Sequence, residues 1–148
     1  MSVTIYHNPD CGTSRNTLAM IRGAGIEPQI ILYVESPPDR ARLVELIDRA
    51  GLSVREAIRV KDTPYFELGL DNPDLSDEEL IEAMLADPIL INRPFVETPH
   101  GVRLCRPSEI VLDILPEALG IPFTKEDGEV VIDAAGNRVW LVSRAEAP

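Results

Sequence analysis

Residues 3–22, VTIYHNPDCGTSRNTLAMIR, decide the fold of this chain. The first four, Val3 to Tyr6, are β-branched or aromatic and predict a short strand. Asn8-Pro9 and Gly12 then break the pattern, so a loop is expected between this strand and the next element. From Ser14 to about Arg22 apolar residues recur at helical spacing, which predicts a helix. A strand that runs through a short loop into a helix is the opening of an α/β unit.

The next elements repeat this order. Gln29 to Val34 predicts a second and more fully buried strand. Ser36-Pro37-Pro38 predicts the start of a second helix, and Gly51 predicts its end. Strand, helix, strand and helix in this order indicate a βαβ unit within a layered α/β domain. The expected fold class is therefore α/β.

The rest of the chain adds a helical region and more strands. Leu52 to Asp87 is acidic and is expected to be helical. Pro94 to Glu97 and Val102 to Cys105 predict two short strands joined by a hairpin turn. Ser108 to Leu115 predicts a final helix.

These elements predict one domain over residues 1–120, with a helical insertion at about 38–88. Residues 121–148 are expected to form a C-terminal extension. Its turn signals are Glu126-Asp127-Gly128 and Ala135-Gly136-Asn137. We expect a hairpin and a loose tail in this extension.

Composition narrows the classes of function. In 148 residues, 25 acidic side chains outnumber 14 basic ones and give a formal net charge of −11. This balance argues against nucleic acids and anionic membranes as partners, so any anionic ligand must be held by local positive groups. Two cysteines and two histidines argue against a disulfide scaffold and against a metal site. With neither a signal peptide nor an apolar run of membrane-spanning length, a cytoplasmic location is expected.

Cys11 lies where the predicted loop enters the predicted helix. Free N–H groups and the positive end of the helix dipole gather there, which lowers a thiol pKa and favours oxyanions. His7 lies four residues before Cys11 and could support a thiolate there. The pattern predicts an anion-binding loop with a nucleophile at its edge, made of Cys11, Gly12, Thr13, Ser14 and Arg15. The competing interpretation is a buried structural cysteine beside a capped helix.

Three arginines that interrupt apolar or turn-like segments form a second group: Arg59, Arg93 and Arg106. Arg93 and Arg106 each precede a proline at an element boundary, where an arginine can present its bidentate fork to an oxyanion. The alternative for each is a solvated or salt-bridged surface arginine. A cis Arg93–Pro94 bond is a further hypothesis, because this proline opens a strand.

Cys105, at the end of a predicted strand, has two interpretations. It is either a thiol that resolves a Cys11 intermediate as a disulfide, or a small apolar residue that completes the strand.

Four segments together resemble the glutaredoxin-coupled bacterial arsenate reductases. The first, which resembles their active-site signature, is His7 to Asn16. The other three are Ile89 to Pro94, Leu104 to Glu109 and Phe123 to Gly128, and the resemblance covers about Thr4 to Arg138. It implies a thioredoxin-like fold, a small mixed sheet flanked by helices, with an inserted helical region. It also implies the reduction of arsenate to arsenite.

The resemblance assigns roles to individual residues. Cys11 matches the nucleophile of the family, and the residues that match its oxyanion-holding and thiolate-holding arginines are Arg59, Arg93 and Arg106. His7 and Ser14 match residues that support the thiolate. Pro94 matches the cis-proline of thioredoxin-like folds, and Cys105 matches a cysteine that turnover does not need.

In this family the thiolate forms an adduct with arsenate, glutathione attacks the adduct, and glutaredoxin resolves the mixed disulfide. Arsenate, glutathione and glutaredoxin are thus the expected partners, with no tightly bound cofactor. Because Ser14 occupies the second position of a C-x-x-C motif, the reducing thiol must come from outside or from Cys105. The alternative function is a thioredoxin-fold regulator that binds RNA polymerase. Such relatives usually carry C-x-x-C and have no evident need for three anion-holding arginines.

Overall fold

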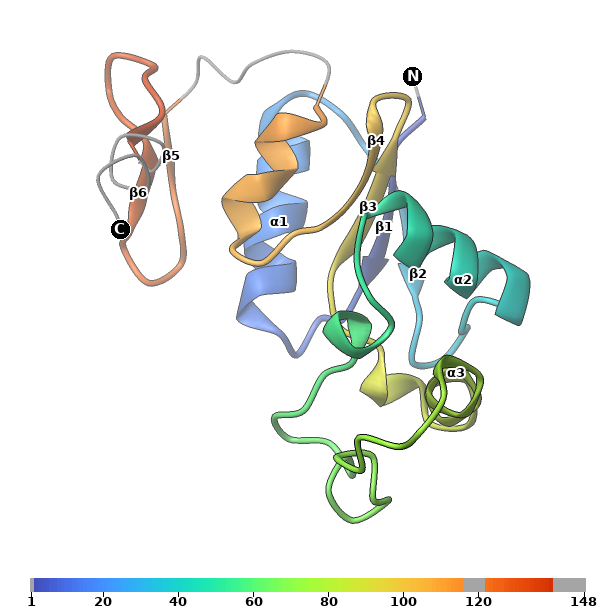
Figure 1. The fold of residues 1–148 in the computed structure, drawn as a ribbon. Helices are drawn as coiled ribbons and strands as arrows, with labels where there is room; N and C mark the ends of the chain where they lie inside the picture. Colours follow the sequence, from blue (N-terminus) through green and yellow to red (C-terminus); the bar gives the residue numbers. More distant parts are fainter. Residues whose placement is uncertain (1, 116–121, 140–148) are drawn as a thin grey trace.

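The computed structural model describes residues 2–115 and 122–139 (Figure 1). Its main sheet has four strands in the spatial order β2-β1-β3-β4. These strands are β1 (Thr4–His7), β2 (Gln29–Leu32), β3 (Phe95–Thr98) and β4 (Gly101–Leu104). β1 and β2 are parallel, whereas β3 is antiparallel to both of its neighbours. The small mixed sheet flanked by helices and the βαβ unit are confirmed.

The sheet separates two hydrophobic clusters, because successive residues of a strand point to opposite faces. Ile5 and Val96 are fully buried in one cluster, with α1 (Gly12–Gly23) and the 3₁₀ helix η3 (Ser108–Asp113). Phe95 is fully buried in the other, with α2 (Arg40–Arg49) and α3 (Asp77–Ala86). Figure 1 shows α1 and α2 on opposite sides of the sheet.

The burial predicted for the second strand is wrong. Gln29 and Leu32, at its two ends, are exposed. The reason is its position: β2 is an edge strand of the described sheet and pairs with β1 alone. Only a strand with neighbours on both sides and covered faces is buried as a whole.

The predicted start of the second helix is also wrong. α2 begins at Arg40, and its N-cap is Asp39, whose side chain accepts a hydrogen bond from the Arg42 backbone N–H at 2.8 Å. An N-cap aspartate satisfies one of the free N–H groups of the first turn, so the helix starts there and not at the prolines.

The segment from Leu52 to Asp87 is less helical than predicted. It contains the short 3₁₀ helix η1 (Arg55–Ala57) and α3, and residues 58–75 are irregular. Pro64, Gly69 and Pro73 punctuate this stretch and prevent a continuous helix. The Arg55 side chain stabilises this irregular stretch, because it donates to the Leu70 and Asn72 carbonyls at 2.9 and 2.6 Å.

The segment Ser108–Asp113 is a 3₁₀ helix and not the longer helix predicted to Leu115. Another 3₁₀ helix, η2 (Pro88–Leu90), precedes β3. The C-terminal strands β5 (Phe123–Thr124) and β6 (Val130–Ile132) form a separate antiparallel pair. Val131 and Ile132 are buried in the same cluster as Leu18 and Ile21 of α1, so this hairpin packs on the domain.

The predicted loose tail falls on residues 140–148, which lie outside the described residues. Among the helices of the described ranges, none combines the length and apolar character needed to cross a membrane.

We expect Ser76→Ala to lower the free energy of unfolding by about 1 kcal/mol, because it removes a capping box. Ser76 Oγ accepts from the Glu79 N–H at 3.2 Å, and the Glu79 carboxylate accepts from the Ser76 N–H at 3.2 Å. Urea denaturation measures the loss. Ser36→Ala is the control, because Ser36 is exposed and its hydroxyl forms no hydrogen bond to any described residue. Equal losses in the two variants would contradict a capping role.

Candidate active site

Cys11 lies at the point where β1 has ended and α1 begins. It is the N-cap residue of α1, with extended backbone angles, and its carbonyl accepts from the Arg15 N–H at 3.0 Å. Its own N–H donates to the Asn8 carbonyl at 3.1 Å, which closes the loop that precedes it. Cys11 is 9% exposed, so protein atoms cover most of its surface.

The surroundings of the sulfur favour the thiolate. Burial opposes ionisation, but hydrogen bonds from the Ser14 backbone N–H, Arg106 and Arg93 outweigh it and lower the pKa of the Cys11 thiol. The Arg106 contact joins Nη1 to Cys11 Sγ at 3.6 Å. This lowered pKa distinguishes Cys11 from an inert core cysteine, whose pKa burial would raise.

The three predicted arginines do come together around this sulfur. Arg59 follows η1, Arg93 precedes β3, and Arg106 follows β4. Arg106 Nη1 also donates to the Arg93 carbonyl at 3.0 Å, which links the last two segments. Burial and the charges of Arg106 and Arg93 lower the pKa of Arg59, whereas the negative charge of Cys11 opposes that shift. The three guanidinium groups thus lie close enough for their charges to repel one another.

No carboxylate of the described residues forms an ion pair with Arg59, Arg93 or Arg106. The Nε atoms of Arg59 and Arg93 are buried and have no hydrogen-bond partner in that part of the chain. A buried cation without a partner costs free energy of folding unless a bound anion neutralises it. The arrangement fits an oxyanion with several oxygens, held next to the Cys11 sulfur. It does not fit the surface-arginine alternative.

His7 and Ser14 form a buried pair next to the loop. His7 Nδ1 and Ser14 Oγ are 2.6 Å apart, and Ser14 Oγ accepts from the Asn8 N–H at 3.1 Å. Burial, with the charges of Arg22 and Arg15, lowers the pKa of His7, which favours the neutral imidazole beside the Ser14 hydroxyl. The hydroxyl of Ser14 thereby fixes the loop, and its backbone N–H faces the sulfur.

The remaining predicted residues of the loop have different surroundings. Arg15 is exposed and donates to Glu126 and to the Pro9 carbonyl, so its side chain is engaged with protein atoms. The Thr13 carbonyl accepts from Thr17 Oγ1 at 2.8 Å inside the helix. A Cβ on Gly12 would lie 3.5 Å from Glu126 Oε1, an ordinary contact, so the protein itself leaves room for a side chain there.

The Arg93–Pro94 peptide bond is cis, and so is the Arg106–Pro107 bond, which was not predicted. The Pro94 carbonyl accepts from the Cys105 N–H at 2.9 Å. This contact joins the start of β3 to the end of β4, so the two segments that carry Arg93 and Arg106 are in register.

Cys105 is fully buried in the hydrophobic cluster of Ile5 and Val96. Burial raises the pKa of the Cys105 thiol, and its sulfur lies 3.8 Å from the Arg103 carbonyl oxygen. Both cysteines are free. This environment favours the small apolar residue over the resolving thiol.

Sequence reasoning missed two residues in contact with the site. Asn8 is buried, and its Nδ2 donates to the Tyr33 hydroxyl at 3.5 Å, while its Oδ1 accepts from the Asp10 N–H at 2.9 Å. Tyr33 is fully buried, and burial raises its pKa. The sequence signal for this contact is that Tyr33 follows an aliphatic run. A tyrosine buried there needs a hydrogen-bond partner for its hydroxyl.

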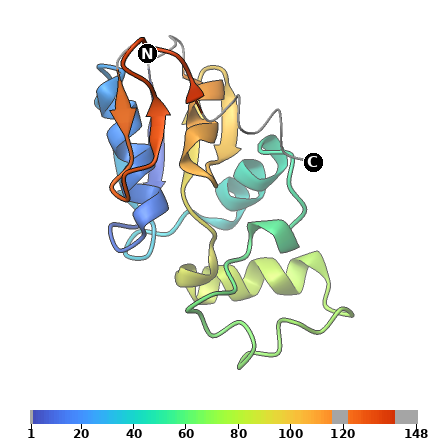
Figure 2. The same cartoon turned by 90° about the vertical axis from the view of Figure 1, so that its left-hand side faces the viewer.

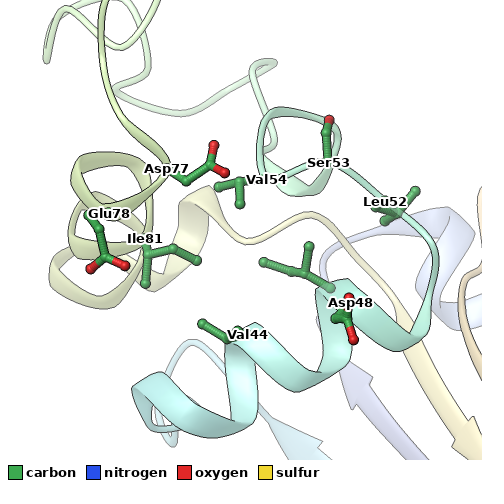
Figure 3. A pocket seen from close by; sticks show the side chains of 9 residues that line it. Val44, Asp48, Leu52, Ser53, Val54, Asp77, Glu78 and Ile81 are labelled. Carbon is green, nitrogen blue, oxygen red and sulfur yellow. The ribbon is translucent and has the colours of Figure 1, made fainter.

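One hollow lies away from this site. It is a groove of about 320 Å³ between α2 and α3, lined by Val44, Ile81 and acidic residues at its rim (Figure 3). Two smaller hollows flank the Cys11 loop. One, of about 180 Å³, lies on the side of His7 and Asn8, and the other, of about 260 Å³, lies between Gly12 and the C-terminal hairpin.

Known proteins are similar to this chain in both sequence and fold. Residues 6–114 match the model of the ArsC family. An arsenate reductase of Rhizobium meliloti is 66% identical over 139 residues, which cover 94% of this chain and 99% of the relative. An arsenate reductase of Escherichia coli is 59% identical over 138 residues, which cover 93% of this chain and 98% of the relative.

Two solved structures share the fold. A putative arsenate reductase from Yersinia pestis superimposes with a TM-score of 0.72 at 46% identity, over 76% of this chain and 100% of its own. An arsenate reductase from Vibrio cholerae gives a TM-score of 0.74 at 46% identity, over 78% and 98% respectively.

We expect iodoacetamide to alkylate only Cys11 in the native protein, and Cys105 only after unfolding. The pH profile of the Cys11 rate should have its midpoint below about 8.5, the value of an ordinary thiol. Arg106→Ala should raise the midpoint, because the thiolate loses a charged donor at 3.6 Å. Arg103→Ala, three residues away, is the control. Native alkylation of Cys105, or an unshifted midpoint in Arg106→Ala, would contradict the assignment.

Proposed function

This chain belongs to the ArsC family and has a thioredoxin-like fold, and on that basis we propose that it reduces arsenate to arsenite through a covalent Cys11–arsenate adduct. The observation that carries the proposal is the contact of 3.6 Å between Arg106 Nη1 and Cys11 Sγ. It supports the proposal because a thiol of lowered pKa then lies beside an arginine that, like Arg59 and Arg93, forms no ion pair with a carboxylate of the described residues.

The geometry supports the first chemical step. Arsenate is a tetrahedral dianion near neutral pH, so three convergent guanidinium groups neutralise it and present it to the sulfur. The Cys11 thiolate attacks arsenic and an S–As bond forms, while the bond from arsenic to the hydroxyl of arsenate breaks, and this hydroxyl takes up a proton from solvent and leaves as water. Arsenic remains As(V) in this step. Arg59, Arg93 and Arg106 hold the remaining oxygens.

The second step reduces arsenic. A glutathione thiolate attacks Cys11 Sγ, an S–S bond forms, and the S–As bond breaks with its electron pair on arsenic. Arsenic becomes As(III) and leaves as arsenite. A glutaredoxin thiolate then attacks the glutathione sulfur and returns the Cys11 thiolate.

Two positions inside the chain could in principle supply the reducing thiol, and the surroundings of both support an external donor instead. Ser14 stands where a C-x-x-C motif would have its second thiol, and its hydroxyl is engaged with His7 and Asn8. Cys105 is fully buried, with a raised pKa. Glutathione and glutaredoxin supply the two electrons in this proposal.

We expect Cys11→Ser to abolish arsenate-dependent NADPH oxidation in an assay coupled through glutathione, glutaredoxin and glutathione reductase. Serine lacks a low-pKa nucleophile and cannot form the mixed disulfide. Cys105→Ala is the matched control and should keep most of the activity. Arsenite formation is measured in parallel.

Turnover by Cys11→Ser would overturn the mechanism. Absence of turnover in the folded parent protein, with a reactive Cys11, would transfer support to the regulator that binds RNA polymerase, and a polymerase pull-down would test that alternative.

We expect Arg59→Ala to raise the KM for arsenate by about tenfold or more, equivalent to about 1.4 kcal/mol, while the free energy of unfolding stays constant or increases. Binding falls because an oxyanion donor is lost. Stability does not fall because the substitution removes a repelled, half-buried cation. Steady-state kinetics and urea denaturation measure the two effects. Arg22→Ala, on an exposed arginine of α1, is the control. Loss of stability without a change in KM would contradict the assignment.

A further inference from the structure

The C-terminal hairpin contacts both segments that carry the reacting groups. Figure 2 shows β5 and β6 lying across α1. Lys125 and Glu126 follow β5 directly, and they contact two different parts of the site. The Glu126 contact joins the C-terminal extension to Arg15, 111 positions earlier in the chain.

Glu126 is connected to the loop of Cys11. Its carboxylate accepts two hydrogen bonds from Arg15, from Nε at 3.0 Å and from Nη2 at 2.9 Å. The third donor of the same guanidinium group, Nη1, reaches the Pro9 carbonyl at 2.8 Å. The Glu126 N–H also donates to Asn16 Oδ1 at 3.1 Å. Arg15 thus bridges the hairpin and the loop that ends at Cys11.

Lys125 is connected to the segment of Arg106. Its Nζ lies 2.5 Å from Glu109 Oε1, and the Glu109 side chain is 1% exposed. The same carboxylate oxygen accepts from Ser108 Oγ at 2.9 Å. Glu109 lies in η3, which directly follows Arg106-Pro107. Lys125 therefore fixes the hairpin to the chain just after Arg106.

We propose that Glu126 is a positioning residue for Cys11: acting through Arg15, it holds the Cys11 loop in place relative to the Arg106 segment, which Lys125 holds from the other side. Arg15 is in this view a structural bridge and not an oxyanion ligand. The inference rests on the proposed function only where turnover is measured, because its main readout concerns the thiol alone.

Magnitudes support a geometric role. The Arg15 and Glu126 side chains are 44% and 48% exposed, and an ion pair this exposed adds about 1 kcal/mol or less to stability. The contact from Arg106 to the sulfur, at 3.6 Å, joins two separate segments, so a displacement of either segment changes it directly. The bridge therefore affects the thiol more than the stability of the fold.

The decisive experiment compares Glu126→Gln with Glu27→Gln by the pH profile of Cys11 alkylation with iodoacetamide. Glu27 is the matched control, because it accepts two hydrogen bonds at 3.0 Å from Arg22, which lies on α1 as Arg15 does. Loss of a negative charge near the sulfur would by itself lower the pKa of Cys11. Loss of positioning raises it, so charge and geometry predict opposite signs.

We expect Glu126→Gln to raise the midpoint and to slow alkylation at pH 7 about threefold, equivalent to about half a pKa unit. Arg15→Ala should do the same, and the double variant should be no slower than the slower single variant, since both act through one bridge. Glu126→Asp should restore part of the rate. In turnover, kcat should fall while the KM for arsenate stays constant.

Three results would overturn the proposal. The first is a midpoint in Glu126→Gln that equals that of Glu27→Gln or lies below it. The second is a raised KM with an unchanged midpoint in Arg15→Ala, which would make Arg15 a substrate ligand. The third is additive effects of the two substitutions. The melting temperature of each variant checks that the hairpin stays folded. A failed arsenate assay with the expected midpoints would overturn the proposed function and leave the positioning role standing.

Discussion

Repulsion among three guanidinium groups is the constraint on which the rest of the site depends. Arg59, Arg93 and Arg106 come from three separate segments and face one thiol, with the charges of the other two arginines lowering the pKa of Arg59. Left to themselves, such groups would move apart into water. Two hydrogen bonds help to hold them: the Arg59 backbone N–H donates to the Leu90 carbonyl at 2.7 Å, and the Arg106 guanidinium donates to the Arg93 carbonyl at 3.0 Å. The packed sheet thus supplies the rigidity that keeps the charges together.

Local signals in the sequence were sufficient to predict the elements that surround Cys11. The strand from Thr4, the loop and the start of α1 depend on short-range preferences, and so does the N-terminal position of Cys11. The convergence of the arginines came from resemblance and not from spacing, because it depends on how β3 and β4 pair. The Glu126–Arg15 contact joins residues 111 positions apart, and no local pattern encodes such a contact.

The errors have a common physical origin. The burial of β2 depends on whether another strand lies beyond it, which is a property of the whole sheet. Acidic, polar sequence between Leu52 and Asp87 has helix formers, yet Pro64, Gly69 and Pro73 divide it and the Arg55 side chain fixes an irregular course. The start of α2 was set by one carboxylate, that of Asp39, against the prolines before it. In each case tertiary context or one specific hydrogen bond decided between two reasonable local patterns.

Ser14 has a consequence for how such a site can evolve. Its hydroxyl lies 2.6 Å from His7 Nδ1 and also accepts from the Asn8 N–H, inside a fully buried position. A sulfur there is larger and a much weaker hydrogen-bond partner, so a second thiol would unsettle the very loop that presents the first. The step to a self-sufficient dithiol is therefore opposed by the packing of the existing site. In the proposed mechanism the reducing thiol therefore comes from outside the chain, and the rate of turnover follows the supply of small-molecule thiols.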